Sequence, residues 1–142
     1  NELQIIKRRR EMGSYYKQIA ARFRRQAAEA QRAKGVVDGK ISRLRKASSS
    51  LASEIQSIDN RARSLGQILP LDSSSFKGSR QQDFEGHFYN LGTDITNFRD
   101  GHNNNKTTIE DKIRSLETQS SELQSAIASY YHQARIYEYM ED

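Results

Sequence analysis

The middle of the chain reads Leu69-Pro70-Leu71-Asp72-Ser73-Ser74-Ser75, and this stretch decides the fold. Pro70 is the only proline in 142 residues, and a proline disfavours helical geometry at the residue before it. The aspartate and the serines that follow are turn and helix-cap formers. We therefore predict a turn near residues 70–79 that separates the two halves of the chain.

The half before Pro70 carries an apolar heptad repeat whose register never breaks. Its positions follow alternating steps of four and three residues. They are Tyr16, Ala20, Phe23, Ala27, Ala30, Lys34, Val37, Ile41, Leu44, Ser48, Leu51, Ile55, Ile58, Ala62, Leu65 and Leu69. The repeat predicts one helix over about residues 2–69, and a helix of this length must be stabilised by packing against a partner helix.

The half after the turn carries the same repeat, with one stretched step after Ile109. Ser79 and Gln82 fit a capping box, so we predict the second helix over about residues 80–139. The repeat positions are Phe84, Phe88, Leu91, Ile95, Phe98, His102, Asn105, Ile109, Ile113, Leu116, Ser120, Leu123, Ile127, Tyr130, Ala134 and Tyr137.

The weak point of the second helix is residues 101–106, Gly-His-Asn-Asn-Asn-Lys. Glycine and asparagine both disfavour helix interiors, and Thr107 with Glu110 offers a fresh capping box. The sequence leaves open whether the helix breaks here or continues.

Each predicted helix has its nearest partner in the other half of the chain. In a hairpin, facing positions have numbers that sum to about 153, which places Phe23 opposite Tyr130. Apolar layers then meet apolar layers, and polar layers meet polar ones. Other facing pairs are Leu65 with Phe88, Ile58 with Ile95, Ile55 with Phe98, Leu44 with Ile109, Val37 with Leu116, Ser48 with Asn105 and Lys34 with Ser120. We predict an all-α fold in which residues 1–142 form one long antiparallel two-helix hairpin, coiled-coil-like in its packing.

The composition supports a hairpin rather than a multilayer core, because only 35% of the residues are hydrophobic and 29% are charged. Residues 1–46 hold 14 Lys and Arg against 4 Asp and Glu, whereas residues 47–142 hold 9 against 14. A hairpin sets the basic half beside the acidic half. No apolar run approaches the roughly 18 residues of a membrane helix, so we do not expect an integral membrane protein.

The sequence carries no pattern of a catalytic or metal site. It has no cysteine, and its three histidines, His87, His102 and His132, have no carboxylate at ligand spacing. It also lacks a glycine-rich phosphate loop and a nucleophile elbow, and two helices offer no enclosed pocket. We therefore expect a non-enzymatic protein without a cofactor or a metal.

Basic residues cluster at Lys7, Arg8, Arg9 and Arg10. Such a cluster can contact phosphate backbones or anionic lipid heads, although most basic clusters are ordinary solvated surface. Few aromatic residues interleave with it, so we do not expect a nucleic-acid partner. A basic-surface binder and a structural coiled-coil oligomerisation protein remain the two alternative functions.

Phe76-Lys77-Gly78 lies in the predicted turn, directly before the second helix. A Trp-x-Gly triplet in the turn between two helices is the layout of the WXG proteins of type VII (ESX) secretion, and this triplet resembles it with Phe in place of Trp. The stretch from Phe76 through Ile127 resembles the YwqH-like small helical proteins that are encoded beside LXG-domain toxins in Gram-positive bacteria. It contains Phe-Lys-Gly-Ser followed by Phe84-Glu85, and later Ile109-Glu110-Asp111-Lys112-Ile113.

The resemblance implies a non-catalytic targeting factor or chaperone. Such proteins pair with the helical LXG domain of a toxin, with or without a second small helical accessory protein, and help to present it to the type VII secretion ATPase. Tyr137 and Glu141 fit the Tyr-x-x-x-Asp/Glu pattern of the family's export signal. The resemblance implies a cytoplasmic location and leaves open whether the protein leaves the cell with its cargo.

A two-helix hairpin leaves apolar residues beside its seam uncovered unless another helix docks. We predict that these residues contact the partner helix. They are Ile5, Ile6, Ile19, Ile68, Tyr131 and Ile136.

Overall fold

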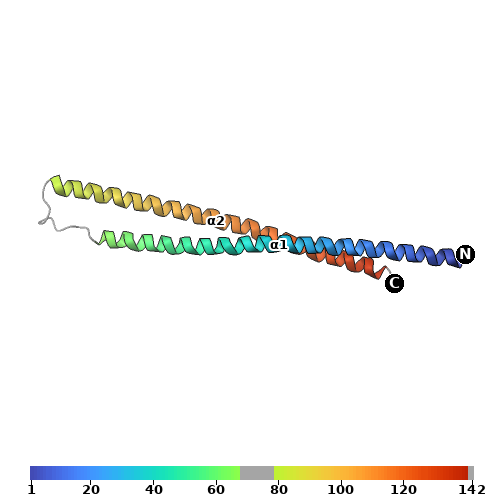
Figure 1. The fold of residues 1–142 in the computed structure, drawn as a ribbon. Helices are drawn as coiled ribbons and strands as arrows, with labels where there is room; N and C mark the ends of the chain where they lie inside the picture. Colours follow the sequence, from blue (N-terminus) through green and yellow to red (C-terminus); the bar gives the residue numbers. More distant parts are fainter. Residues whose placement is uncertain (68–78, 141–142) are drawn as a thin grey trace. The chain divides into compact units, whose positions relative to one another are not determined.

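The computed structural model describes residues 1–67 and 79–140, and it contains two helices in this part of the chain (Figure 1). Helix α1 spans Glu2–Gly66 and helix α2 spans Ser79–Tyr139. No strand occurs among the described residues, so the predicted all-α class is confirmed. The helices contribute to two compact units, unit 1 with Asn1–Ser42 and Arg114–Asp142, and unit 2 with Arg43–Ile113.

The two helices run antiparallel in both units. In unit 1, the ring centroids of Tyr16 and Tyr137 lie 6.2 Å apart, and Phe23 lies 6.4 Å from Tyr130. Both pairs satisfy the predicted sum of 153, which confirms the hairpin pairing there. In unit 2, Asp59 of α1 pairs with Arg99 of α2, and Glu54 pairs with His102. Numbers that rise along α1 therefore meet numbers that fall along α2.

Local interactions account for the described start and end of α1. The side-chain oxygen of Asn1 accepts a hydrogen bond of 3.2 Å from the backbone N–H of Leu3, as an N-cap residue does. Glu2 lies in the first turn and Arg63 in the last, where their charges complement the helix dipole. The helix ends at Gly66, and the end that the heptads predicted, at residue 69, lies outside the described residues.

Small side chains fill the core of unit 1. Ala27 and Ala134 are fully buried, and alanines at the seam let the two helices approach closely. The larger core residues contribute most of the apolar area that is removed from water. The buried apolar residues of unit 1 are Ala20, Ala27, Ala30, Val37, Ile41, Leu116, Ile127 and Ala134.

Unit 2 is packed more loosely. Among its described residues, Ile113 is the only apolar residue that is buried. The α1 seam positions from Leu44 to Leu65 are half-buried. Phe98 remains 60% exposed and Leu91 45% exposed, so unit 2 keeps large apolar side chains in contact with water.

Helix α2 runs without a break through residues 101–106. Side chains reinforce this stretch: His102 reaches the backbone oxygen of Phe98, and Thr108 donates to the backbone oxygen of Asn104. The Lys106 ammonium pairs with Glu110 one turn further along. These contacts compensate for the weak helix propensity of glycine and asparagine, so the break that the sequence left open is absent here.

The register of α2 in unit 2 differs from the predicted one. Leu91, Phe98 and Asn105 were expected in the seam, but all three are exposed. Arg99 and Lys106 are half-buried instead, which places the stretched step near Ile95 rather than after Ile109. A straight helix drifts relative to a strict heptad, and this drift carries Leu91 and Phe98 to the edge of the seam.

Candidate interaction surface

Several of the predicted site residues lie outside the described residues. These are Phe76, Lys77 and Gly78 of the turn triplet, Ile68 of the predicted docking set, and Glu141 of the predicted export signal.

Tyr137 is part of the packing of unit 1. Its ring stacks on Phe23 with centroids 5.8 Å apart and planes 17° apart, and the side chain is half-buried. The neighbouring Glu138 accepts a hydrogen bond of 2.7 Å from Arg24 Nε of α1. The ring of Tyr137 is therefore held against Phe23 of α1, and any protein that binds Tyr137 would meet it in this packed position.

The basic cluster from Lys7 to Arg10 is exposed, as are all residues from 1 to 12. Figure 1 shows this blue end of α1 running past the described end of α2. Ile5 and Ile6 share the exposed segment, at 50% and 47%. This end of unit 1 thus combines positive charge with uncovered apolar side chains.

The other predicted docking residues differ in exposure. Tyr131 is 38% exposed, whereas Ile19 and Ile136 are half-buried. Ile5, Ile6, Ile19, Tyr131 and Ile136 belong to unit 1, and they do not line the hollows found in unit 2.

A polar cluster joins the helices within unit 1. Lys34 Nζ donates to Asp38 Oδ2 over 2.8 Å, and Ser120 Oγ of α2 donates to Asp38 Oδ1 over 2.6 Å. The hydrogen bond from the Lys34 ammonium, followed by that from Ser120, lowers the pKa of Asp38 below its usual value near 3.8. Lys34 and Ser120, which were expected to face each other, are thus linked through the carboxylate of Asp38. The heptad pattern did not predict this role of Asp38.

His102 provides the corresponding polar contact in unit 2. Its Nδ1 lies 3.1 Å from the backbone oxygen of Phe98, and its Nε2 lies 3.1 Å from Glu54 Oε2 on α1. Both partners are hydrogen-bond acceptors, so either ring nitrogen is placed to donate an N–H to the acceptor that it faces. His102 therefore links α2 to α1 within unit 2.

An apolar groove runs between the helices in unit 2, and we call it the Ile58–Phe98 groove. Its volume is about 450 Å³. Arg61 stands on its α1 side and Asp94 on its α2 side, and both are exposed. The groove is lined by Ile58, Arg61 and Leu65 of α1, and by Asp94, Ile95 and Phe98 of α2.

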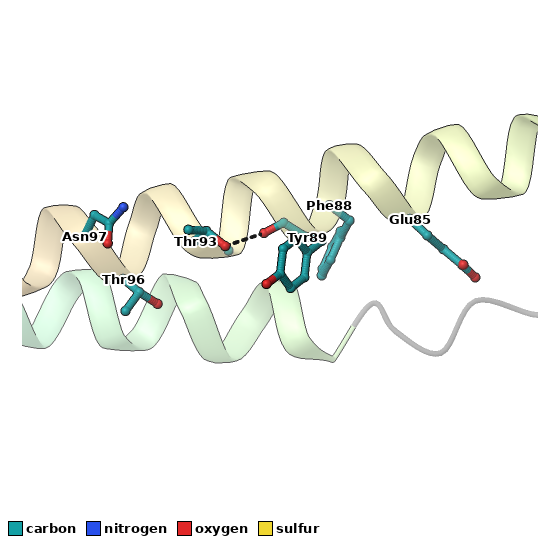
Figure 2. Close-up of a pocket in the computed structure, with 7 residues that line it drawn as sticks. Glu85, Phe88, Tyr89, Thr93, Thr96 and Asn97 are labelled. Carbon is teal, nitrogen blue, oxygen red and sulfur yellow. Dashed lines mark hydrogen bonds between the residues drawn. The ribbon is translucent and has the colours of Figure 1, made fainter.

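A second hollow, of about 710 Å³, lies along α2 alone. Figure 2 shows the rings of Phe88 and Tyr89 on the same side of the helix, with Asn97 pointing away from them. Thr93 donates to the backbone oxygen of Tyr89, so this hydroxyl is already engaged. The hollow is open and lies on a single helix, which makes it a weaker candidate than the groove between two helices.

The profile of the YwqH-like family matches residues 17–135, which is 119 of the 142 residues. The chain belongs to the YwqH-like family. The match extends the resemblance from the second helix to most of the first. No match is found among curated proteins.

Some of the candidate surfaces lie inside the residues that match the YwqH-like family, and others lie outside them. The match includes every residue of the Ile58–Phe98 groove, whereas the basic cluster at 7–10 and Tyr137 lie beyond its two ends. The groove therefore lies within the part of the chain that matches the family.

This YwqH-like chain presents no cluster of three or more His, Cys, Asp and Glu side chains that could hold a metal, within residues 1–67 and 79–140. Over the same residues, neither helix contains a stretch long and apolar enough to span a membrane.

The heptad pattern predicted that Leu91 and Phe98 are buried in the seam between the helices. It did not predict that both lie exposed at the edge of that seam. One signal was available. The acidic Asp59 of α1 pairs with the basic Arg99 of α2, so Arg99 faces α1 next to the position where the heptads had placed Phe98.

Proposed function

We propose that this YwqH-like protein is a non-catalytic targeting factor or chaperone that binds the helical LXG domain of a type VII secreted toxin and promotes its export. One observation carries the proposal. This member of the YwqH-like family has an apolar groove between its two helices, and Phe98 at the edge of the groove is 60% exposed. A helical domain that docks there removes this apolar surface from water.

The protein would bind its partner through contacts between helices and would catalyse no reaction. The hairpin would join the toxin in a multi-helix complex, with or without a second small helical protein. Tyr137 and Glu141 would contribute to a composite export signal that the secretion ATPase reads.

Co-expression tests the binding step. The full chain and the LXG domain of a toxin encoded beside its gene should co-elute as one stable complex on size exclusion. The matched control is an LXG domain from an unrelated locus, which should elute separately. Separate elution of the cognate pair would refute the binding role, and unchanged toxin secretion from cells that lack this protein would refute the targeting role.

A second candidate function follows from one observation, the exposure of Lys7, Arg8, Arg9 and Arg10 at an α1 end without α2 cover. This cluster could bind an anionic surface. Binding to vesicles with anionic lipids should then fall steeply with salt. Equal vesicle binding after all four residues are changed to alanine would remove this alternative.

A further inference from the structure

We infer that the Ile58–Phe98 groove binds one amphipathic helix of a partner protein, and that this helix carries a carboxylate along one flank of its apolar edge and a cation along the other. The inference relies on the proposed function for the helical nature of the partner. It adds the surface that holds the helix and the charge pattern that this surface selects.

The floor of the groove suits the apolar edge of a helix. Ile58 and Leu65 lie seven residues apart on α1, and Ile95 and Phe98 lie one turn apart on α2. Together they line a hollow of about 450 Å³ with hydrocarbon side chains. Amphipathic helices fill such grooves with side chains at positions i, i+3 or i+4, and i+7.

The two sides of the groove carry opposite charges. Arg61 is exposed on the α1 side and Asp94 on the α2 side, and neither forms an ion pair with another described residue. A helix with acidic residues on both flanks would place one of them against Asp94, and a helix with basic residues on both flanks would face Arg61. Among helices with charged residues on both flanks, only one with a flank of each sign avoids a like-charge contact, and it also places an opposite charge against both Arg61 and Asp94.

A second copy of this chain fits the same face less well. If α1 of one copy lay on α2 of the other, Arg61 would meet Asp94. However, Arg43 lies 18 residues, or five full turns, before Arg61, and Lys112 lies 18 residues after Asp94. The same pairing would bring these two cations together, so the charge pattern favours a foreign helix.

Binding of synthetic helical peptides to the full-length chain tests the inference. Three peptides of about 21 residues share leucines at the a and d positions of their central heptads. One has Glu on one flank and Lys on the other, one has Glu on both, and one has Lys on both. We expect the mixed peptide to bind at least ~10-fold more tightly than either of the others, as measured by fluorescence anisotropy below the concentration at which the peptides self-associate.

Charge variants then identify the two sides of the groove. Arg61→Glu makes both sides acidic and should shift the preference to the Lys peptide. Asp94→Lys makes both sides basic and should shift it to the Glu peptide. Arg63→Glu is the matched control, because Arg63 is exposed on the same helix but does not line the groove, and it should change no affinity by more than ~2-fold.

An apolar variant tests the floor. Phe98→Ser should weaken binding of the mixed peptide by at least ~10-fold. Tyr89→Ser is the control, since Tyr89 is an exposed aromatic residue of α2 outside the groove, and it should have an effect below ~2-fold. Both residues are more than half exposed, so the fold should survive either change.

The outcomes separate this inference from the proposed function. Equal binding of the three peptides, no binding, or preferences that ignore Arg61 and Asp94 would overturn the groove assignment. So would a dimer in sedimentation that Phe98→Ser converts to a monomer, because a second copy would then occupy the groove. If the LXG domain still co-elutes in any of these cases, the proposed function stands and only the groove assignment fails. If the peptides behave as expected and no LXG domain binds, the groove remains and the toxin role fails.

Discussion

His102 Nε2 lies 3.1 Å from Glu54 Oε2, and this contact links α2 to α1 within unit 2. The other ring nitrogen faces the backbone oxygen of Phe98 at the same distance. The carboxylate thus faces a ring that is already tied to its own helix.

Replacing Glu54 by alanine should lower the stability of the helix pair modestly. Glu54 is 60% exposed at its side chain, so solvent screens the interaction and we expect a loss of about 0.3–1 kcal/mol. Urea unfolding monitored by circular dichroism measures it. The control is Glu11→Ala in the exposed end of α1, which should be neutral; equal effects of the two changes would show that the contact with His102 contributes nothing.

Asp38→Asn should change how stability depends on pH. The pKa of Asp38 is lowered in the folded state by Lys34 and then by Ser120, so the unfolded chain takes up a proton first as the pH falls. The contribution of Asp38 is therefore complete well above pH 3.8 and is lost as the pH falls through that value toward the folded-state pKa.

The Asp38→Asn variant should be less stable than the parent at neutral pH, and the difference should shrink below about pH 3.8. Thermal unfolding at a series of pH values checks this. Asp83→Asn serves as the control on an exposed residue of α2. A constant difference between the Asp38→Asn variant and the parent at every pH would contradict the prediction.

Gly101→Ala should stabilise α2. A Cβ atom at residue 101 meets no other atom within 4 Å, and the residue lies inside a continuous helix. Alanine has the higher helix propensity, so we expect a gain of about 0.5–1 kcal/mol. Helical content and the urea midpoint measure it, and a loss of stability would indicate that α2 is broken at this glycine in solution.

Tyr137 can be tested for packing and for export with two different substitutions. Tyr137→Phe keeps the ring that stacks on Phe23 and should preserve stability, whereas Tyr137→Asp should cost about 2–4 kcal/mol because it removes an aromatic ring and brings a charge to the seam. Differential scanning calorimetry distinguishes them.

The export assay then needs the conservative variant. If Tyr137 belongs to a signal that recognises its hydroxyl, Tyr137→Phe should block secretion while the complex with the toxin persists. Normal secretion of the Tyr137→Phe variant would show that the hydroxyl of Tyr137 is not part of the export signal. The charge-reversing pair Tyr137→Asp with Glu141→Lys should also block export, but it disturbs the ring stack. Glu141→Lys alone, like Tyr137→Phe, tests the signal while the ring stack is kept.

The helices and their pairing in unit 1 followed from the heptad pattern, because apolar residues at steps of four and three leave one buried face. Phe23 meets Tyr130 as the pattern required. The seam of α2 in unit 2 did not follow from it. There α2 turns a different face toward α1, and Arg99 contacts Asp59 while His102 contacts Glu54. A rule based on hydrophobicity does not take such polar contacts into account.

The heptad pattern did not predict the groove for the same reason. Phe98 has the right spacing for a seam, and only the shifted register exposes it at the edge of the groove. The bridging role of Asp38 was equally hidden, since it lies one turn after a seam lysine and outside the heptad positions.

The uneven packing of the two units has a consequence for amide exchange. Unit 1 buries a series of alanines and branched residues, whereas the described part of unit 2 buries only Ile113 to a similar extent. Segments with few buried contacts open first, so the amides of Ser79–Ile113 should exchange with deuterium sooner than those of residues 20–41 and 116–134, the segments of unit 1 that hold its buried residues. A ligand that covers unit 2 would slow that exchange, and part of its intrinsic affinity would go into ordering the less protected half of the molecule.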